Sequence, residues 1–409
     1  MRRIPAELCV RCKGAKFLCG LTSCPILERF RAVTNAASKV RLDVGLLQGS
    51  TPPSVIVGEK GYPKVSLSFN VAPEVVGEQA RLYEDPAGWW GRASLHDIIN
   101  YRSSLVSNFF MYRINDVWKL YEKEISLATI SERPVLSESK VTGKLETKLK
   151  FDGIVMPRGP TVKADDIRVT ENPKVPKILD RLINDDVKAN DAVLTLYRGG
   201  EDVYRVVSAL STGLLGTLKN RKLVPTRWAI TAVDSIVGDS LLKEVRDLPW
   251  VSETSVFFQG YLGNYFHIII YPSSFFSTWV EIWYPTSLWA GELAITDLSE
   301  DYWGKYGTLD GGYMAARLAA LEYLTKIRRS AGVMIIREVT GEYFAPVGNW
   351  HIRETVRRAF NNRLGTFQGL GEALDLVQGR LKDGRVKLRE IRAIKRVLNQ
   401  TRIDSFFDS

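Results

Sequence analysis

The sequence predicts a mixed α/β (α+β) protein with a central, partly antiparallel, aromatic-rich sheet surrounded by helices. Three runs rich in aromatic and β-branched residues, separated by Gly and Pro-Ser-Ser turns, are typical of an antiparallel sheet. The stretch 310–329 has apolar residues at helical spacing and ends in basic residues, which predicts an amphipathic helix. The chain has 409 residues, of which 45% are hydrophobic, so it can bury a large core. The three sheet strands are expected at 253–259, 265–271 and 278–284.

The remaining elements follow from local patterns along the chain. Ser94 and Asp310 stand before apolar periodic stretches and are expected helix N-caps. The aromatic side chains of the central strands could stack on nucleobases, but most are expected in the core. Further strands are expected at 54–57, 64–70, 141–151, 192–197, 228–233 and 333–339. Further helices are expected at 26–38, 94–108, 115–125, 174–187, 201–210, from 350, at 366–381 and at 386–400.

The basic residues concentrate at the two ends of the chain. The net charge is +10, and residues 1–64 hold 11 Lys and Arg against 4 Asp and Glu, while residues 350–409 hold 13 against 7. Basic ends suit a polyanionic partner such as DNA, although solvated basic helices are an equally good explanation. We expect a zinc knuckle and basic segment over 1–40, an α/β core over 41–363, a basic helical region over 364–399 and a flexible peptide over 400–409. A division of the core into two subdomains near 131–175 is an alternative.

The chain shows no segment that would direct it to a membrane. Arg2, Arg3 and Pro5 are followed by cysteines and charges rather than by an apolar signal region. The most apolar region, near 256–295, is interrupted by polar residues and prolines and has no uncharged run of about 20 residues. We therefore expect a cytoplasmic protein, associated with the nucleoid if DNA is its partner.

All four cysteines lie near the amino terminus with the spacing Cys9-x2-Cys12-x6-Cys19-x4-Cys24. Two thiolates separated by two residues can chelate one ion, and four thiolates suit tetrahedral Zn²⁺ and leave no open position for catalysis. The sequence therefore predicts a structural zinc site. A disulfide pair or an iron–sulfur cluster is an alternative, but the first fits poorly without an export signal and the second lacks the usual spacings.

The last ten residues carry an apolar plug. Ile403 and Phe406 fall on one side of a tight turn, Phe407 extends that side, and the amide of Gln400 can donate and accept hydrogen bonds. The pattern Gln-x-x-Ile-x-x-Phe-Phe resembles the peptide that docks into the DNA sliding clamp, PCNA. The alternative is a last turn that folds its phenylalanines onto its own domain. The preceding helix is predicted to be amphipathic and to offer a DNA-binding face of Lys387, Arg389, Arg392, Lys395 and Arg396.

A candidate catalytic site depends on a predicted strand at 228–233. Asp234 would lie at the end of this strand, where α/β proteins commonly place functional side chains. If the protein hydrolyses DNA or nucleotides, carboxylates must hold Mg²⁺ or Mn²⁺, while Arg or His stabilises charge or moves protons. Asp234 could equally cap a helix, and Arg227 could pair with a buried carboxylate. The candidates are Arg227, Asp234, Asp239, Asp310 and His351.

Three features together resemble the archaeal Nre (novel repair) family. They are the four-cysteine knuckle, the block Val-Pro-Thr-Arg-Trp-Ala-Ile-Thr-Ala-Val-Asp at 224–234 with the later Gly-Gly-Tyr-Met-Ala-Ala-Arg-Leu at 311–318, and the terminal clamp peptide. The resemblance implies an archaeal DNA-repair protein that binds PCNA. It implies no settled reaction, so no catalytic residue follows from it.

Two hypotheses for the function remain. The first is a DNA-repair protein that the clamp recruits and that acts on DNA or a lesion, as a metal-dependent hydrolase if it is an enzyme. The second is a non-catalytic adaptor that binds DNA and the clamp, with further repair proteins as potential partners. A nucleotide-binding enzyme unrelated to repair is a weaker third.

Overall fold

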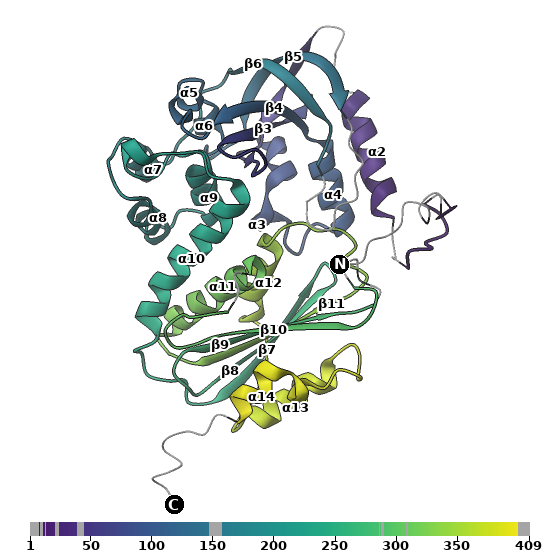
Figure 1. Ribbon diagram of the computed structural model, residues 1–409, viewed down its shortest axis with the longest axis vertical. Helices are drawn as coiled ribbons and strands as arrows, with labels where there is room; N and C mark the ends of the chain where they lie inside the picture. Colours follow the sequence, from purple (N-terminus) through teal and green to yellow (C-terminus); the bar gives the residue numbers. More distant parts are fainter. Residues whose placement is uncertain are drawn as a thin grey trace, which may run out of the picture. The chain divides into compact units, whose positions relative to one another are not determined.

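The computed structural model describes residues 8, 11–12, 14–20, 24–38, 45–146, 158–285, 287, 290–307 and 310–399 (Figure 1). The chain divides into two compact units. The barrel unit comprises residues 24–237 and 345–348, and the sheet unit comprises 1–23, 238–344 and 349–409. The prediction of a mixed α/β protein is confirmed, but each unit has its own sheet.

Five strands of the barrel unit form a ring in the order β1–β5–β6–β4–β3–β1. β4 and β6 run parallel, and the other neighbours in the ring are antiparallel. β1 and β3 pair at only two positions, so the ring is partly open there. The short strand β2 pairs with residues 67–69 of β3. The strands are β1 (Leu46–Thr51), β2 (Val55–Val57), β3 (Lys64–Pro73), β4 (Val106–Arg113), β5 (Val135–Glu146) and β6 (Thr161–Val169).

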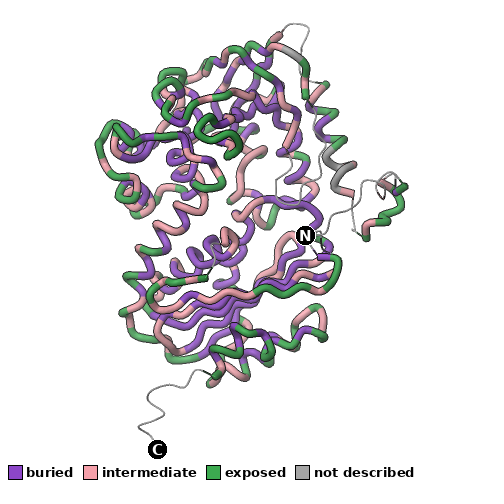
Figure 2. Tube along the Cα trace, viewed as in Figure 1, coloured by how far each residue is buried: buried purple, intermediate pink, exposed green. Residues whose placement is uncertain are grey.

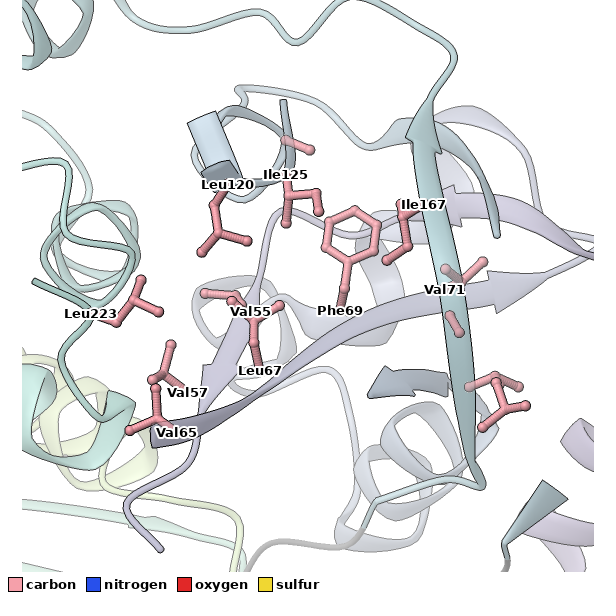
Figure 3. Packing of buried hydrophobic residues seen from close by; sticks show 14 of the residues in the cluster. Val55, Val57, Val65, Leu67, Phe69, Val71, Leu120, Ile125, Ile167 and Leu223 are labelled. Carbon is pink, nitrogen blue, oxygen red and sulfur yellow. The ribbon is translucent and has the colours of Figure 1, made fainter. Parts of the chain in front are cut away.

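Alternation along β3 builds the core of this barrel. Val65, Leu67 and Phe69 are fully buried, whereas Lys64 is exposed and Ser66 is half-buried. Since successive side chains of a strand point to opposite faces, the apolar set points inward as one group. Figure 3 shows these residues packed with Leu120 and Ile125, which come from the short helices α5 (Val117–Glu122) and α6 (Ile125–Ala128). Each fully buried side chain of this size contributes about 1.5–3 kcal/mol.

The other helices of the barrel unit follow local signals. Ser94 accepts a hydrogen bond from Asp97 N while the Asp97 carboxylate accepts one from Ser94 N, so the predicted N-cap is confirmed as a capping box. The helices and turns are α2 (Pro25–Ser38), η1 (Gly77–Glu84), α3 (Pro86–Trp89), α4 (Leu95–Ser104), α7 (Lys177–Ile183), α8 (Ala189–Arg198), α9 (Val203–Ser211), η2 (Leu218–Asn220) and the start of α10 (Thr226–Val245).

Three predictions for this unit are wrong. The predicted strand 192–197 lies in α8 and the predicted strand 228–233 lies in α10, while the predicted helix 94–108 ends at Ser104 before β4. The reason is that a short, continuous apolar run suits a buried helix as well as a strand. In α8, Ala192, Val193 and Leu196 are buried, which is a helical spacing.

The sheet unit has six strands in the order β10–β9–β11–β8–β7–β12. The three expected strands exist, but β8 pairs with β7 and β11, and β9 pairs with β10 and in parallel with β11. The parallel pair is possible because α11 (Gly311–Ile327) lies in the connection between these strands. The strands are β7 (Thr254–Tyr261), β8 (Asn264–Tyr271), β9 (Phe276–Trp283), β10 (Ala294–Glu300), β11 (Gly332–Val339) and β12 (Arg363–Phe367).

Helices cover both faces of this sheet. Figure 1 shows α11 and α12 (Trp350–Ala359) on one side and α13 (Leu370–Arg380) and α14 (Arg392–Leu398) on the other, and Figure 2 shows the strands between them as largely buried. The helical C-terminal region is confirmed, with changed limits. The predicted helix 366–381 begins as β12, and the predicted helix 386–400 is a turn, η3 (Leu388–Glu390), followed by α14.

The described helices include none that is both long and apolar enough to cross a membrane.

Candidate functional site

The predicted strand-end site is replaced by the helix α10. Pro225 starts this helix, since its carbonyl accepts hydrogen bonds from Trp228 N at 2.8 Å and Ala229 N at 2.9 Å. Asp234 therefore lies within a helix, where it is 1% exposed. Arg227 is exposed and its Nη1 lies 3.5 Å from a carboxylate oxygen of Glu59. The alternative that Arg227 pairs with a buried carboxylate is wrong, because its partner Glu59 is exposed.

The other three candidates lie in the sheet unit and have structural partners. Asp239 lies 3.0 Å from Arg317 Nη2, and Asp310 caps α11 by accepting a hydrogen bond from Tyr313 N at 2.8 Å. His351 is 2% exposed, with its Nε2 3.4 Å from Arg337 Nη2. No three His, Cys, Asp or Glu side chains among the described residues form a group that could hold a metal. Metal-dependent hydrolysis through these five residues remains a prediction.

The second of the two sequence blocks belongs to a buried ion-pair network. Arg317 donates from Nε and Nη2 to the carboxylate of Glu300, each at 2.7 Å, and Tyr313 donates its hydroxyl to the same carboxylate. Burial opposes the charge of Arg317, but the bonds to Glu300 outweigh it and raise the pKa of the guanidinium. A Cβ at Gly238 of α10 would lie 2.4 Å from Arg317 Nη1, so the glycine provides the space for the guanidinium.

Two further polar networks lie on opposite faces of β11. On one face, Arg337 donates to Glu281 at 2.6 Å and to Asn264 at 2.6 Å. On the other face, Glu338 accepts hydrogen bonds from His267 Nε2 at 2.9 Å, from Lys382 N at 2.8 Å and from the hydroxyl of Tyr284. Burial raises the pKa of Glu281; burial acts likewise on Glu338, but its hydrogen bonds outweigh burial and lower its pKa. The first network joins three neighbouring strands, and the second also joins the sheet to the segment that follows α13.

We expect Glu300→Gln to destabilise the sheet unit by about 3–5 kcal/mol, because the change removes the buried counter-ion of Arg317 and leaves only the half-exposed Asp239. Urea denaturation followed by circular dichroism measures the loss. The matched control is Asp375→Asn, which breaks the exposed pair with Arg389 and should cost no more than about 1 kcal/mol. Equal losses in the two variants would show that the buried pair has no special weight.

The described part of the cysteine knuckle fits a thiolate ligand. Backbone N–H groups, that of Leu18 foremost, face the sulfur of Cys12, and they outweigh burial and lower the pKa of its thiol. Gly14 has φ +73°, a left-handed conformation that bends the chain behind the second predicted ligand. Cys12, Cys19 and Cys24 form no disulfide, and the structure does not bring these three described cysteines together as a group that could hold a metal; Cys9 lies outside the described residues. The four cysteines remain the predicted zinc ligands.

We expect the purified protein to contain one zinc ion per chain, measured by inductively coupled plasma mass spectrometry. Cys12→Ser should lower the zinc content to near zero, because a hydroxyl replaces a thiolate that the backbone N–H groups favour. Ser54→Ala, outside the knuckle, should leave the zinc content unchanged. Full zinc content in Cys12→Ser would contradict the predicted ligand set.

The five basic residues predicted to bind nucleic acid all lie exposed on η3, α14 and the residue before η3. Arg389 pairs with Asp375 at 2.9 Å and Arg392 with Asp297 at 2.7 Å, and Arg396 lies over the ring of Phe276. Lys387 and Lys395 have no ion-pair partner among the described residues. These two lysines are therefore the members of the set most available to a phosphate.

The barrel unit contains a cavity of about 620 Å³ beside the start of α10. Three exposed lysines line it, and its lining includes no Asp or Glu. Two half-exposed rings, Tyr62 and Trp228, also line it, with their centroids 5.8 Å apart. No local pattern in the sequence reveals this site, because its residues come from separate segments; the basic run 219–222 is its one local signal. The three lysines that line the cavity are Lys188, Lys219 and Lys222.

Hydrogen bonds fix the backbone of residues 223–226, which forms the floor of the pocket and the start of α10. Thr226 Oγ1 accepts a hydrogen bond from Val57 N at 2.8 Å and lies 3.0 Å from Ser211 Oγ. Val224 N donates to Ser211 O at 2.9 Å, and Leu223 N donates to Ile114 O at 2.7 Å. Because the backbone of this floor is held by β2, α9 and the end of β4, the pocket is largely preformed.

The two sequence blocks and a chain of two units, each with its own sheet, are the features to compare with known protein families. The model of the N-terminal part of archaeal Nre proteins matches residues 18–290 and that of the C-terminal part matches residues 300–406, so the chain belongs to the archaeal Nre family. The resemblance seen in the sequence is thereby confirmed.

Named relatives extend the match over almost the whole chain. DNA repair protein NreA of Archaeoglobus fulgidus is 36% identical over 408 residues, 98% of both chains. DNA repair protein NreA of Haloferax volcanii is 34% identical over 343 residues, 80% of this chain and 81% of the relative. DNA repair protein NreB of Archaeoglobus fulgidus is 31% identical over 375 residues, 90% of this chain and 92% of the relative. No solved structure matches the chain significantly.

Proposed function

We propose that this protein is a DNA-repair protein that binds DNA and is brought to it by the sliding clamp PCNA. The observation that carries the proposal is the match to DNA repair protein NreA, which covers 98% of both chains. A likeness over that length includes both units, so it bears on the whole protein rather than on one shared module. A structural zinc ion at the knuckle belongs to the same proposal.

Contact with DNA is supported by the charge at the carboxyl-terminal end of the described chain. Lys387 and Lys395 are exposed and lack ion-pair partners among the described residues, so binding a phosphate would break no existing pair. The adjacent Arg389 pairs with the exposed Asp375, and such a pair is weak enough to exchange for phosphate. Arg392 is itself exposed, although its partner Asp297 is largely buried.

The non-catalytic adaptor is the form of this function that the described geometry favours. The predicted catalytic carboxylates either lie in a helix interior or bind a guanidinium or a helix N-terminus, as Asp234, Asp239 and Asp310 do. The enzyme hypothesis is best tested at Asp239, whose side chain is 56% exposed, because a change at the buried Asp234 tests folding first.

We expect Lys387→Ala with Lys395→Ala to weaken duplex DNA binding and to reduce the slope of log affinity against log salt by about 1.8, since each lost phosphate contact contributes about 0.9. Fluorescence anisotropy with a labelled duplex at several salt concentrations measures both. The matched control is Lys305→Ala with Lys326→Ala, which removes the same charge from exposed lysines before and at the end of α11. Equal effects of the two double variants would mean that only net charge matters, and the proposed DNA-binding face would be wrong.

We expect Phe406→Ala with Phe407→Ala to abolish binding to PCNA, because the plug would lose both aromatic anchors that the clamp peptide requires. Calorimetric titration with PCNA measures the loss, and thermal unfolding checks that the fold is intact. Asp408→Ala is the control next to the plug and should bind normally. The peptide, with Gln400 and Ile403, lies outside the described residues, and retained binding in the double variant would refute its role.

A further inference from the structure

The ring of five strands in the barrel unit has the topology of an OB-fold. Its order, β1–β3–β4–β6–β5 and back to β1, includes one parallel pair, β4 with β6, and antiparallel pairs elsewhere. The helices α5 and α6 lie between the third and fourth ring strands, β4 and β5, and β2 is an insertion between the first and second. OB-folds are partly open Greek-key barrels whose second and third strands and first loop commonly bind oligonucleotides. Topology alone does not establish a function, so the surface must carry the argument.

The outer face of the second and third ring strands, β3 and β4, is basic and apolar. The register pairs Lys64 with Arg113 and Ser66 with Met111 on the face opposite the buried Val65 and Leu67. Met111 is 44% exposed, although apolar side chains of that size are usually buried. On the neighbouring β6, Lys163 pairs with the half-buried Phe109 and is exposed. Lys64 and Lys163 have no ion-pair partner among the described residues.

The pocket continues this face through the first loop of the barrel. Tyr62 lies in the connection from β1 to β3 and precedes Lys64 by two residues, so no more than about 7 Å of backbone separates the two. The ring of Tyr62 packs against Trp228, and each side chain keeps about half of its surface exposed, 49% and 48%. The acidic residue Glu59 lies beside Trp228 and accepts a hydrogen bond from its Nε1 at 3.2 Å, which orients the indole ring. Glu59 also pairs with Arg227, which compensates the negative charge of the carboxylate.

The geometry points to single-stranded DNA as the ligand of this surface, with an unpaired base stacked in the pocket on Trp228 and Tyr62 and the backbone running over the lysines towards Lys64 and Lys163. This inference rests on the proposed DNA-binding function and adds the site and the form of DNA. A cavity of about 620 Å³ is within the usual range for small ligands and can take a base with its sugar.

Charge and stacking together favour an unpaired strand over other occupants. A duplex hides the faces of its bases, so it cannot stack on the two rings, whereas every base of a single strand offers a face. An acidic peptide would be attracted by the same lysines but would leave the half-exposed rings without a stacking partner. The lining of lysines without a carboxylate matches a strand that has one phosphate for each base.

The test uses the full chain and a fluorescein-labelled dT12, a length within the range bound by one OB-fold. We expect Trp228→Ala to weaken dT12 binding roughly five- to 150-fold and Tyr62→Ala to act in the same direction, as loss of one base–aromatic stack does. Trp228→Phe should retain most of the affinity, because the phenyl ring can still stack on a base. This variant loses only the hydrogen bond to Glu59. Lys219→Ala should lower the salt slope for dT12 by about 0.7.

The matched control is Trp303→Ala, which removes a tryptophan that is 67% exposed in the sheet unit and should leave dT12 binding unchanged. Duplex binding in the same proteins separates the two proposals. If the wild-type protein binds duplex DNA through its carboxyl-terminal face but dT12 binds Trp228→Ala as tightly as wild type, the inferred site is wrong and the proposed function stands. If the wild-type protein binds neither DNA, both fail.

Discussion

The structure depends most on one constraint: a guanidinium removed from water must meet acceptors inside the fold, because a buried charge left unpaired costs several kcal/mol. Arg317 shows how far the chain goes to meet it. The side chain is 1% exposed, Glu300 accepts two of its hydrogen bonds, and Gly238 leaves room where any other residue would put a Cβ. With Asp239 also in contact, the side chain of Arg317 joins β10, α11 and this turn of α10.

The same constraint shapes the pocket of the barrel unit. Arg221 is 5% exposed and has no carboxylate partner among the described residues; it donates instead to backbone carbonyls. Ile183 is the last residue of α7, Asp185 follows this helix, and Gly216 lies in the loop that lines the pocket. The side chain of Arg221 therefore connects the pocket loop to the end of α7 and satisfies carbonyls that have no partner within the helix. The lysines on either side of Arg221 are thereby presented from a fixed backbone. A preordered loop loses less entropy on binding, which is what a binding site requires.

Local chemistry was predictable from the sequence, and long-range pairing was not. The caps at Ser94 and Asp310 and the strands β2 and β3 follow from signals within a few residues, whereas β1 was not predicted. The stretch 228–233 is a continuous apolar run that fits a strand or a buried helix, and only Pro225 and the packing of α10 decide between them. The parallel pairing of β9 with β11 and the joining of Tyr62 to Trp228 depend on contacts across tens to hundreds of residues. No local pattern encodes such a meeting, so the pocket could not be foreseen.

The distribution of ionisable groups argues for binding rather than proton chemistry in the described part of the protein. A catalytic acid or base usually has a shifted pKa and faces a cavity. Here Tyr313, Glu281 and Glu338, three of the buried groups with shifted pKa values, are each bound to a buried partner. The cavity, by contrast, is lined by lysines, aromatic rings and neutral side chains. A surface of that composition can attract and stack a polyanion, and its described lining includes no carboxylate or imidazole, which agrees with the DNA-binding role proposed above.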